Sequence, residues 1–117
     1  MTLNLDYSQR LNLHALMGQQ RGPVNDIRGY WKLQDKIELT GEEKTACGFR
    51  MVDIPGGGQQ AVWNPAINEA KPFDLSKDEI DRLNKAIRGW ESGFVVQERR
   101  WLEPLLAQLD MSENGHK

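Results

Sequence analysis

The chain has 117 residues, of which 38% are hydrophobic and 27% charged, and its formal net charge is −2. This length fits one domain, and the composition is that of an ordinary folded protein rather than a disordered or membrane-embedded one. No apolar run approaches the roughly 20 residues of a membrane span, and the N-terminal segment MTLNLDYSQR lacks the apolar core of a signal peptide.

The first part of the chain predicts a short strand followed by two helices. Thr2–Leu5 alternates leucines with polar residues, which is typical of a strand. A helix capped by Asp6 or Ser8 should follow and end at Gly18. The next helix, from Pro23 to about residue 36, has a wide apolar arc, so we expect it to be the most buried. Its apolar residues form two adjacent stripes: Val24, Ile27 and Trp31 on one, and Tyr30, Leu33 and Ile37 on the other.

The middle of the chain predicts a β-hairpin. Thr40 and Glu43 form a capping box for a short helix that Gly48 should end. The β-rich runs at residues 49–54 and 60–64 flank Pro55-Gly56-Gly57-Gly58, which is typical of a hairpin turn. Both faces carry apolar residues: Phe49, Met51, Ala61 and Trp63 on one, and Val52, Ile54 and Val62 on the other. Because a lone hairpin is marginal in water, we expect helices to cover one face and a partner or second copy to pair with the other.

Residues 75–109 predict two amphipathic helices, reached through a connector at residues 68–74. Ser76 and Glu79 form a capping box, and Ser92-Gly93 should end the first helix. We expect an antiparallel pair with Trp90 and Trp101 near the contact. The first stripe is Ile80, Leu83, Ile87 and Trp90, and the second is Val95, Leu102, Leu105, Leu106 and Leu109, with Pro104 inside. Core packing is the expected role of the tryptophans.

The predicted fold is therefore α+β. One small domain spans residues 1–110, and about four helices, including the C-terminal antiparallel pair, pack with the hairpin. Residues Leu3–Leu5 are a candidate extra strand that would extend the hairpin. Residues 111–117 are polar and predict a flexible tail.

No residue pattern predicts catalysis. The Pro55-Gly56-Gly57-Gly58 segment lacks a phosphate-binding motif and joins two strands, so a hairpin tip is the better interpretation. The single cysteine, Cys47, has only His14 and His116 as candidate histidine bases, and these three residues have no metal-ligand spacing. We therefore expect no enzyme activity, no cofactor and no metal. One cysteine also excludes an internal disulfide framework and fits a cytoplasmic protein.

Two groups of polar and cationic residues predict binding surfaces. Gln19, Gln20, Arg21 and Arg28 would form one rim, on which a nucleotide could bind with its base stacked on Tyr30 or Trp31. Arg82, Lys85 and Arg88 would lie on the solvent face of the next-to-last helix, and Val62 on the outer face of the hairpin. Acidic neighbours such as Asp78 and Asp81 would repel phosphates, so we expect no nucleic-acid complex at physiological salt.

The order of these elements resembles that of small accessory proteins of tailed bacteriophages and prophages. The resemblance covers residues 1–109 and rests on this element order and on short pieces such as LTGEE at residues 39–43 and VWNP at residues 62–65. It implies a genomic context and carries no functional residues.

The leading hypothesis is a non-catalytic accessory protein that binds a host protein in the host cytoplasm, with a defence system as the natural target to inhibit. The alternatives are a protein that binds or sequesters a nucleotide signal and a nucleic-acid-binding protein. Self-association through the hairpin is a further expectation.

Overall fold

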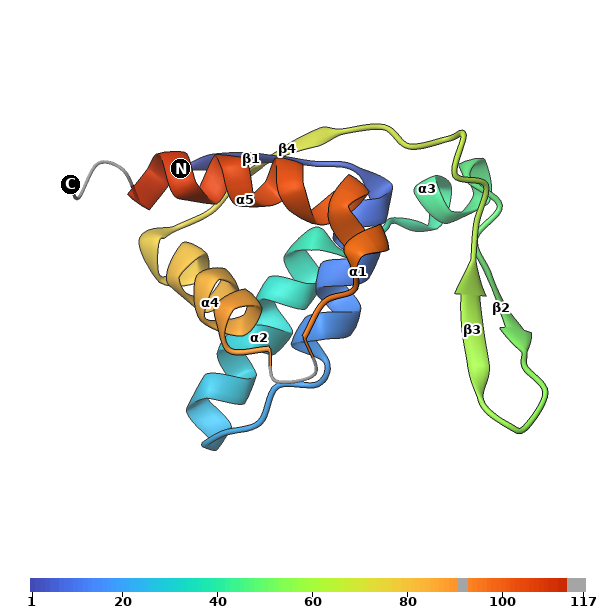
Figure 1. Cartoon of the computed structure of the whole chain (residues 1–117), viewed down its shortest axis with the longest axis horizontal. Helices are drawn as coiled ribbons and strands as arrows, with labels where there is room; N and C mark the ends of the chain where they lie inside the picture. Colours follow the sequence, from blue (N-terminus) through green and yellow to red (C-terminus); the bar gives the residue numbers. More distant parts are fainter. Residues whose placement is uncertain (91–92, 114–117) are drawn as a thin grey trace.

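The first strand of the chain lies beside a segment from its second half. β1 (Thr2–Leu5) pairs antiparallel with β4 (Lys71–Asp74), with Leu3 opposite Phe73 and Leu5 opposite Lys71 (Figure 1). Leu3 and Leu5 are fully buried and their neighbours in β1 are more exposed, which is the alternation of a half-buried strand. The strand predicted at Thr2–Leu5 is confirmed, but the expectation that it extends the hairpin is wrong, because β1 and the hairpin belong to different sheets. Its partner was expected to be a connector, because Pro72 and its polar neighbours give little strand signal.

The computed structural model describes residues 1–90 and 93–113, with side chains through Leu109. Within these ranges the chain is a small α+β domain with five α-helices, one 3₁₀ turn and two two-stranded antiparallel sheets. After β1, the elements in chain order are α1 (Tyr7–Met17), α2 (Val24–Ile37), α3 (Gly41–Ala46), β2 (Arg50–Asp53), β3 (Gln59–Val62), β4, α4 (Lys77–Arg88), η1 (Val96–Glu98) and α5 (Arg99–Glu113).

Three helices begin at capping boxes; those at Thr40 and Ser76 were predicted, and the structure selects Asp6 rather than Ser8 as the cap of α1. Asp6 caps α1 together with Gln9, and Thr40 and Ser76 do the same for α3 and α4 with Glu43 and Glu79. In each box the cap side chain accepts a hydrogen bond from the third helical backbone amide, at 2.8, 3.1 and 3.2 Å respectively. These helix starts are therefore set by local sequence.

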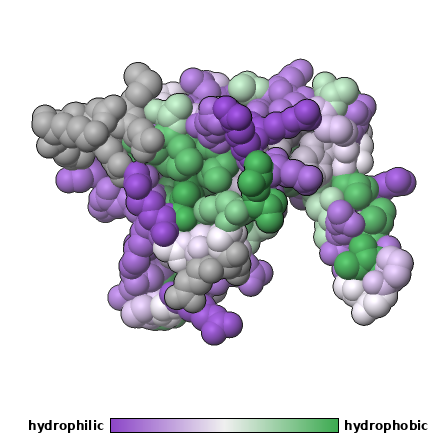
Figure 2. Space-filling view, viewed as in Figure 1, coloured by the Kyte–Doolittle hydropathy of each residue, from purple (hydrophilic) through white to green (hydrophobic). Residues whose placement is uncertain are grey.

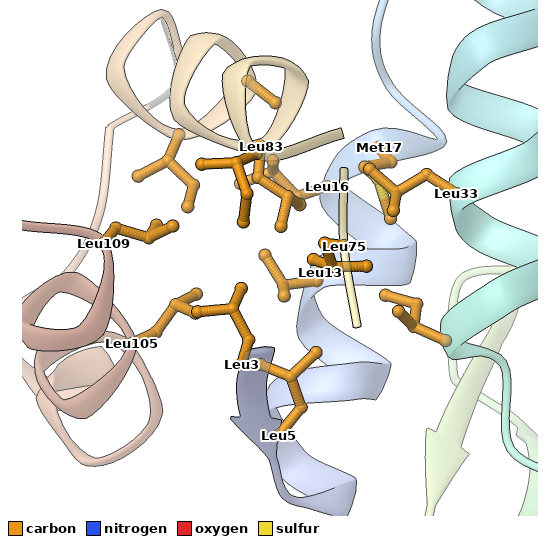
Figure 3. Packing of buried hydrophobic residues seen from close by; sticks show 14 of the residues in the cluster. Leu3, Leu5, Leu13, Leu16, Met17, Leu33, Leu75, Leu83, Leu105 and Leu109 are labelled. Carbon is orange, nitrogen blue, oxygen red and sulfur yellow. The ribbon is translucent and has the colours of Figure 1, made fainter. Parts of the chain in front are cut away.

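The main core lies where α1, α2, α4, α5 and β1 meet (Figure 3). Figure 3 shows leucines from all five elements pointing into one space, together with Leu75 from the loop before α4. On the edge of β1 away from β4, the Gln108 side chain of α5 exchanges two hydrogen bonds with the backbone of Asn4, at 2.8 and 2.9 Å. The start of the chain is thus held between β4 and the last helix.

The expectation that α2 is the most buried helix is wrong. Only Tyr30, Leu33 and Ile37 are buried, whereas Val24 is 59% exposed and Trp31 54% exposed. The helix packs on α1 and α4, which contact one of the two predicted stripes and leave the other open. The apolar arc of the sequence is therefore wider than the surface that the fold covers.

The C-terminal segment also differs from its prediction. α4 ends at Arg88, earlier than expected, because the Gly89 backbone amide bonds back to the Lys85 and Ile87 carbonyls. Ser92, part of the predicted stop, lies outside the described residues. Val95 lies just before the 3₁₀ turn η1 and is 66% exposed, so it is not part of the predicted apolar stripe.

α4 and α5 each pack more extensively on other helices than on each other, and α1 contacts both of them. Pro104 lies inside α5, which continues to Glu113, so the helix extends into the predicted tail; residues 114–117 are not among those described.

β2 and β3 project from the side of the helical part, beyond α3 (Figure 1). They pair antiparallel, with Met51 opposite Ala61 and Val52 opposite Gln60. No residue of either strand is buried, and Met51 is 50% exposed. The expectation that helices cover one face of this hairpin is therefore wrong, since its only anchoring lies at its base. We call residues 49–63 the hairpin arm and the assembly of α1, α2, α4, α5, β1 and β4 the helical body.

Candidate binding surfaces

The hairpin arm presents apolar side chains that the helical body does not cover. Figure 2 shows hydrophobic surface on the projecting arm, separated from that of the body. Met51 lies on one face, and Ile54, which is 38% exposed, lies beside the tip on the other. The tip is closed by backbone bonds between Ile54 and residues 57 and 58, and Gly56, Gly57 and Gly58 all have positive φ, as the turn requires.

A small second core holds the base of the arm. Tyr7, Leu39 and Cys47 are buried there, and Phe49 and Trp63 pack against them from the two ends of the hairpin. The Asn64 backbone amide donates to the Cys47 carbonyl at 2.8 Å, which closes the base. These contacts fix where the arm leaves the body while its outer part stays exposed.

A buried ion pair joins the body to the helix that precedes the arm. Arg10 of α1 is only 2% exposed and donates to both carboxylate oxygens of Glu43 in α3, at 2.6 and 2.8 Å. It also donates to the Ile37 and Glu38 carbonyls, where α2 ends, and its guanidinium lies over the Phe73 ring. The hydrogen bond from Arg10 lowers the pKa of Glu43 from 4.5 to about 2.

The sequence analysis missed this ion pair. Arg10 lies in a segment of α1 with only a slight apolar stripe, and Glu43 was already assigned to a cap. Nothing in a single sequence indicates that a cation and a carboxylate so far apart meet in the interior.

The predicted cationic residues are placed on several different surfaces. Arg28 and Arg82 line one groove between α2 and α4, of about 540 Å³, whose other charged residues are Lys32, Asp78 and Glu79. Lys85 and Arg88 are exposed further along α4, and Gln19, Gln20 and Arg21 lie in the α1–α2 loop. Val62 lies on the hairpin arm, half-buried near its base. The structure thus brings Arg28 and Arg82 together in one groove, while the α1–α2 loop residues, Lys85 with Arg88, and Val62 do not line it.

Arg82 is held by contacts within the fold. Its guanidinium donates to the Asp26 carbonyl at 3.1 Å and lies over the Tyr30 ring. Gly29 makes room for it, because a Cβ at this position would lie 2.2 Å from the Arg82 Cζ atom. Burial raises the pKa of Tyr30, against the opposing effect of Arg82. Arg82 therefore connects α4 to α2. Because its guanidinium already contacts Asp26 and Tyr30, it is less available to bind a phosphate than its sequence position predicts.

The four tryptophans have different environments. Trp101 is 6% exposed, Trp63 and Trp90 are half-buried, and Trp31 is exposed one helical turn from Arg28. The expected core role is therefore wrong for Trp31, since α2 turns that stripe to solvent. Trp31 with Arg28 forms an exposed aromatic and cationic pair on α2.

A pocket lined with aromatic rings lies between α1 and the segment that enters α5. It has a volume of about 210 Å³, and Trp90, Phe94, Glu98, Trp101, Leu16 and Gln19 are among its lining residues. The Phe94 and Trp101 rings meet edge to face, with centroids 6.1 Å apart and planes at 68°. The tryptophans that were expected to meet between two helices therefore line an open pocket, which we call the aromatic pocket.

The residues considered for catalysis and metal binding are Cys47, His14 and His116. Cys47 is fully buried, and its Sγ lies 3.7 Å from the Lys44 carbonyl. No three His, Cys, Asp or Glu side chains among residues 1–90 and 93–109 form a group suited to a metal ion. His116 lies outside the described residues.

Comparison with protein-family models, curated protein sequences and solved structures found no match. None of the described helices has both the length and the apolar character to cross a membrane. A function for this chain therefore has to be inferred from its own residues and their geometry.

Proposed function

We propose that this chain is a non-catalytic accessory protein that binds another protein through the hairpin arm. The observation that carries this proposal is the exposure of Met51 and Ile54 on opposite faces of a hairpin that no helix covers. Apolar side chains kept on a projecting element are typical of an interaction site.

The geometry of the arm suits insertion or strand pairing. Two-stranded hairpins are marginal in water, so the exposed apolar side chains gain most from burial against a partner. The free strand edges also offer backbone amides and carbonyls to an extended segment of that partner. The arm carries Arg50 and Asp53, one charge of each sign, which gives it no strong electrostatic preference. We infer that a protein with an apolar groove or an open sheet edge is the occupant.

The identity of the target class comes from the resemblance to phage accessory proteins. On that ground we propose a host protein in the host cytoplasm, and inhibition of a defence system as the consequence of binding. The host-protein target and the inhibition of a defence system both depend on the resemblance, whereas the role assigned to the arm does not.

The test compares charge substitutions on the arm. Tagged wild type, Met51→Glu, Ile54→Glu and the control Gln60→Glu would be used to capture proteins from host lysate, with quantification by mass spectrometry. The control adds the same charge to the same hairpin without removing an apolar side chain. We expect one protein to be retained by wild type and Gln60→Glu and lost with Met51→Glu and Ile54→Glu.

Two outcomes would contradict the proposal. A captured protein that binds wild type and all three variants equally does not use the arm. Sedimentation would identify the other case, in which Met51→Glu or Ile54→Glu dissociates an oligomer that wild type and Gln60→Glu form. The arm would then be an interface between copies of this chain.

Nucleotide binding is a second candidate, favoured by one observation. Trp31 is 54% exposed beside Arg28, so a base could stack on the indole while the guanidinium contacts a phosphate. At a hundred times its dissociation constant such a ligand would add roughly 2.7 kcal/mol to the free energy of unfolding. A thermal-shift panel of nucleotides, repeated with Trp31→Ala and the control Val24→Ala, would reveal it. A flat panel with wild type would exclude this candidate.

A further inference from the structure

We propose that the aromatic pocket binds a small organic cation whose charge is carried by an alkylated ammonium group. This goes beyond the protein-binding role and uses a different surface, since the pocket lies on the helical body and the arm is not part of it. Success or failure here is therefore independent of the fate of the hairpin proposal.

The first argument is the arrangement of aromatic rings around the pocket. Trp90, Phe94 and Trp101 line the same hollow, and indole rings offer the best faces for a cation. Phe94 and Trp101 stand at 68° to one another, so they form two differently oriented walls rather than one flat platform. Walls of this kind surround a rounded cation better than they stack on a planar base.

The second argument concerns the charge of Glu98. Its Oε2 atom accepts a hydrogen bond from the Val95 backbone amide at 2.8 Å, which fixes the carboxylate in place. Among the residues whose side chains the structure describes, no Lys, Arg or His forms an ion pair with Glu98. A half-buried carboxylate beside aromatic rings attracts a positive ligand and repels an anion.

The third argument concerns size and hydration. The volume of about 210 Å³ is below the roughly 300–1,000 Å³ of pockets for drug-sized ligands. Leu16 and Ala15 contribute apolar lining, so a strongly hydrated primary ammonium would lose water without enough acceptors to replace it. An alkylated ammonium group is weakly hydrated and presents methyl groups to these side chains.

The experiment uses the full chain and two probes of the same shape. Choline would be titrated against 3,3-dimethylbutan-1-ol, in which a carbon replaces the charged nitrogen. The indole N–H signals in ¹H–¹⁵N NMR spectra would be followed, with each tryptophan assigned by its Phe substitution. We expect choline to shift the Trp90 and Trp101 signals in a saturable way and the Trp31 and Trp63 signals little. The neutral alcohol should bind on the order of tenfold more weakly.

Two variants separate the charge from the rings. Glu98→Gln keeps an oxygen that can accept from the Val95 amide but removes the charge, and we expect several-fold weaker choline binding. Trp90→Leu should abolish binding, and its fold would be checked by circular dichroism. Glu103→Gln is the matched control, because Glu103 is an exposed acid of α5 that pairs with Arg99.

The proposal is overturned if the neutral alcohol binds as tightly as choline, which would mean an apolar pocket without cation selectivity. It is equally overturned if Glu98→Gln leaves choline affinity unchanged. Absence of a saturable shift up to about 10 mM choline, a concentration that reports even very weak complexes, would also overturn it.

Discussion

The helical body buries apolar residues in a shared core, whereas the hairpin arm leaves apolar residues exposed. In the body, helices and strands far apart in the sequence supply leucines to one shared core. In the arm, no strand residue is buried, and the arm packs at its base on a cluster of three buried residues. The body therefore has the contacts that make a fold stable, and the arm has the exposed surface that makes a fold useful to a partner.

An ion pair helps to fix the position of the arm relative to the helical body. A hairpin with few buried contacts would swing freely if it were joined to the body by a loop alone. Arg10 and Glu43 prevent this, because their ion pair connects α1 directly to the helix before the arm. Four experiments test the comparison, in order of decreasing expected effect.

Breaking the connection should have the largest effect. Glu43→Ala leaves the Arg10 guanidinium buried without its carboxylate, and removal of one partner of a buried pair costs about 3–5 kcal/mol. Urea unfolding would measure this loss. Lys36→Ala, which breaks the more exposed pair with Glu79, is the control, and such surface pairs contribute about 0–1 kcal/mol. Equal losses for the two variants would contradict the structural role given to Arg10.

Truncation of one apolar residue in each region tests the comparison directly. Leu13 is fully buried in the body, so Leu13→Ala should lower the free energy of unfolding by about 2–5 kcal/mol. Met51 is 50% exposed in the arm, so Met51→Ala should change it by no more than about 0.5 kcal/mol. The measurement is again the urea midpoint. A loss of more than about 2 kcal/mol for Met51→Ala would mean that the arm is part of the core.

Acid should weaken the connection in a defined pH window. The pKa of Glu43 is lowered from 4.5 to about 2, so its stabilising contribution is fully present above pH 4.5 and is lost as the pH falls toward 2. Glu43→Gln removes this titration. We expect the stability difference between wild type and Glu43→Gln to shrink steadily between these two pH values, measured by urea unfolding at several pH values. A difference that stays constant through the window would show that Glu43 is not held as an ion pair.

The smallest effects should come from glycines, with a different reason in each region. Gly57 in the arm has φ of 101°, so Gly57→Ala should cost about 1 kcal/mol or more through strain. Gly29 in α2 tolerates a Cβ if the flexible Arg82 side chain moves away. A gain in helix propensity of up to about 1 kcal/mol then offsets the lost hydrogen bond to Asp26. Thermal unfolding would compare Gly57→Ala with Gly29→Ala. A larger loss of stability for Gly29→Ala would mean that the contacts between Arg82 and α2 contribute substantially to the stability of the fold.

Sequence patterns predicted those parts of the fold whose causes are local. The capping boxes at Thr40 and Ser76 and the glycine turn at residues 55–58 each depend on residues a few positions apart. β4 was missed because Pro72 and its polar neighbours resemble a loop until β1 lies beside them. The wide apolar arc of α2 was misread as burial, because periodicity shows which residues share a face but not whether another element covers it.

The candidate sites, like the fold, were predictable where their causes are local and were missed where they depend on tertiary contacts. The arm was predicted as an element with apolar residues on both faces, but its distance from the body depends on the fold. Arg28 and Arg82 were assigned to two separate cationic surfaces, whereas they line one groove and Arg82 is held by Asp26 and Tyr30. The aromatic pocket was not predicted, since it needs Leu16, Trp90 and Trp101 to meet from three separate segments. Charge and hydropathy indicate which residues can bind, and only tertiary contacts decide which of them remain available.

The bonds between Gln108 and Asn4 have a consequence for the order in which the protein can be made. β1 is synthesised before the two segments that occupy its edges, β4 on one side and α5 on the other. A chain emerging from the ribosome must therefore hold the two buried leucines of β1, Leu3 and Leu5, without a finished core until α5 has been synthesised. Contacts so distant in sequence also slow the search for the native state. During this interval the nascent chain exposes Leu3 and Leu5, and the core around them is complete only once α5 has docked.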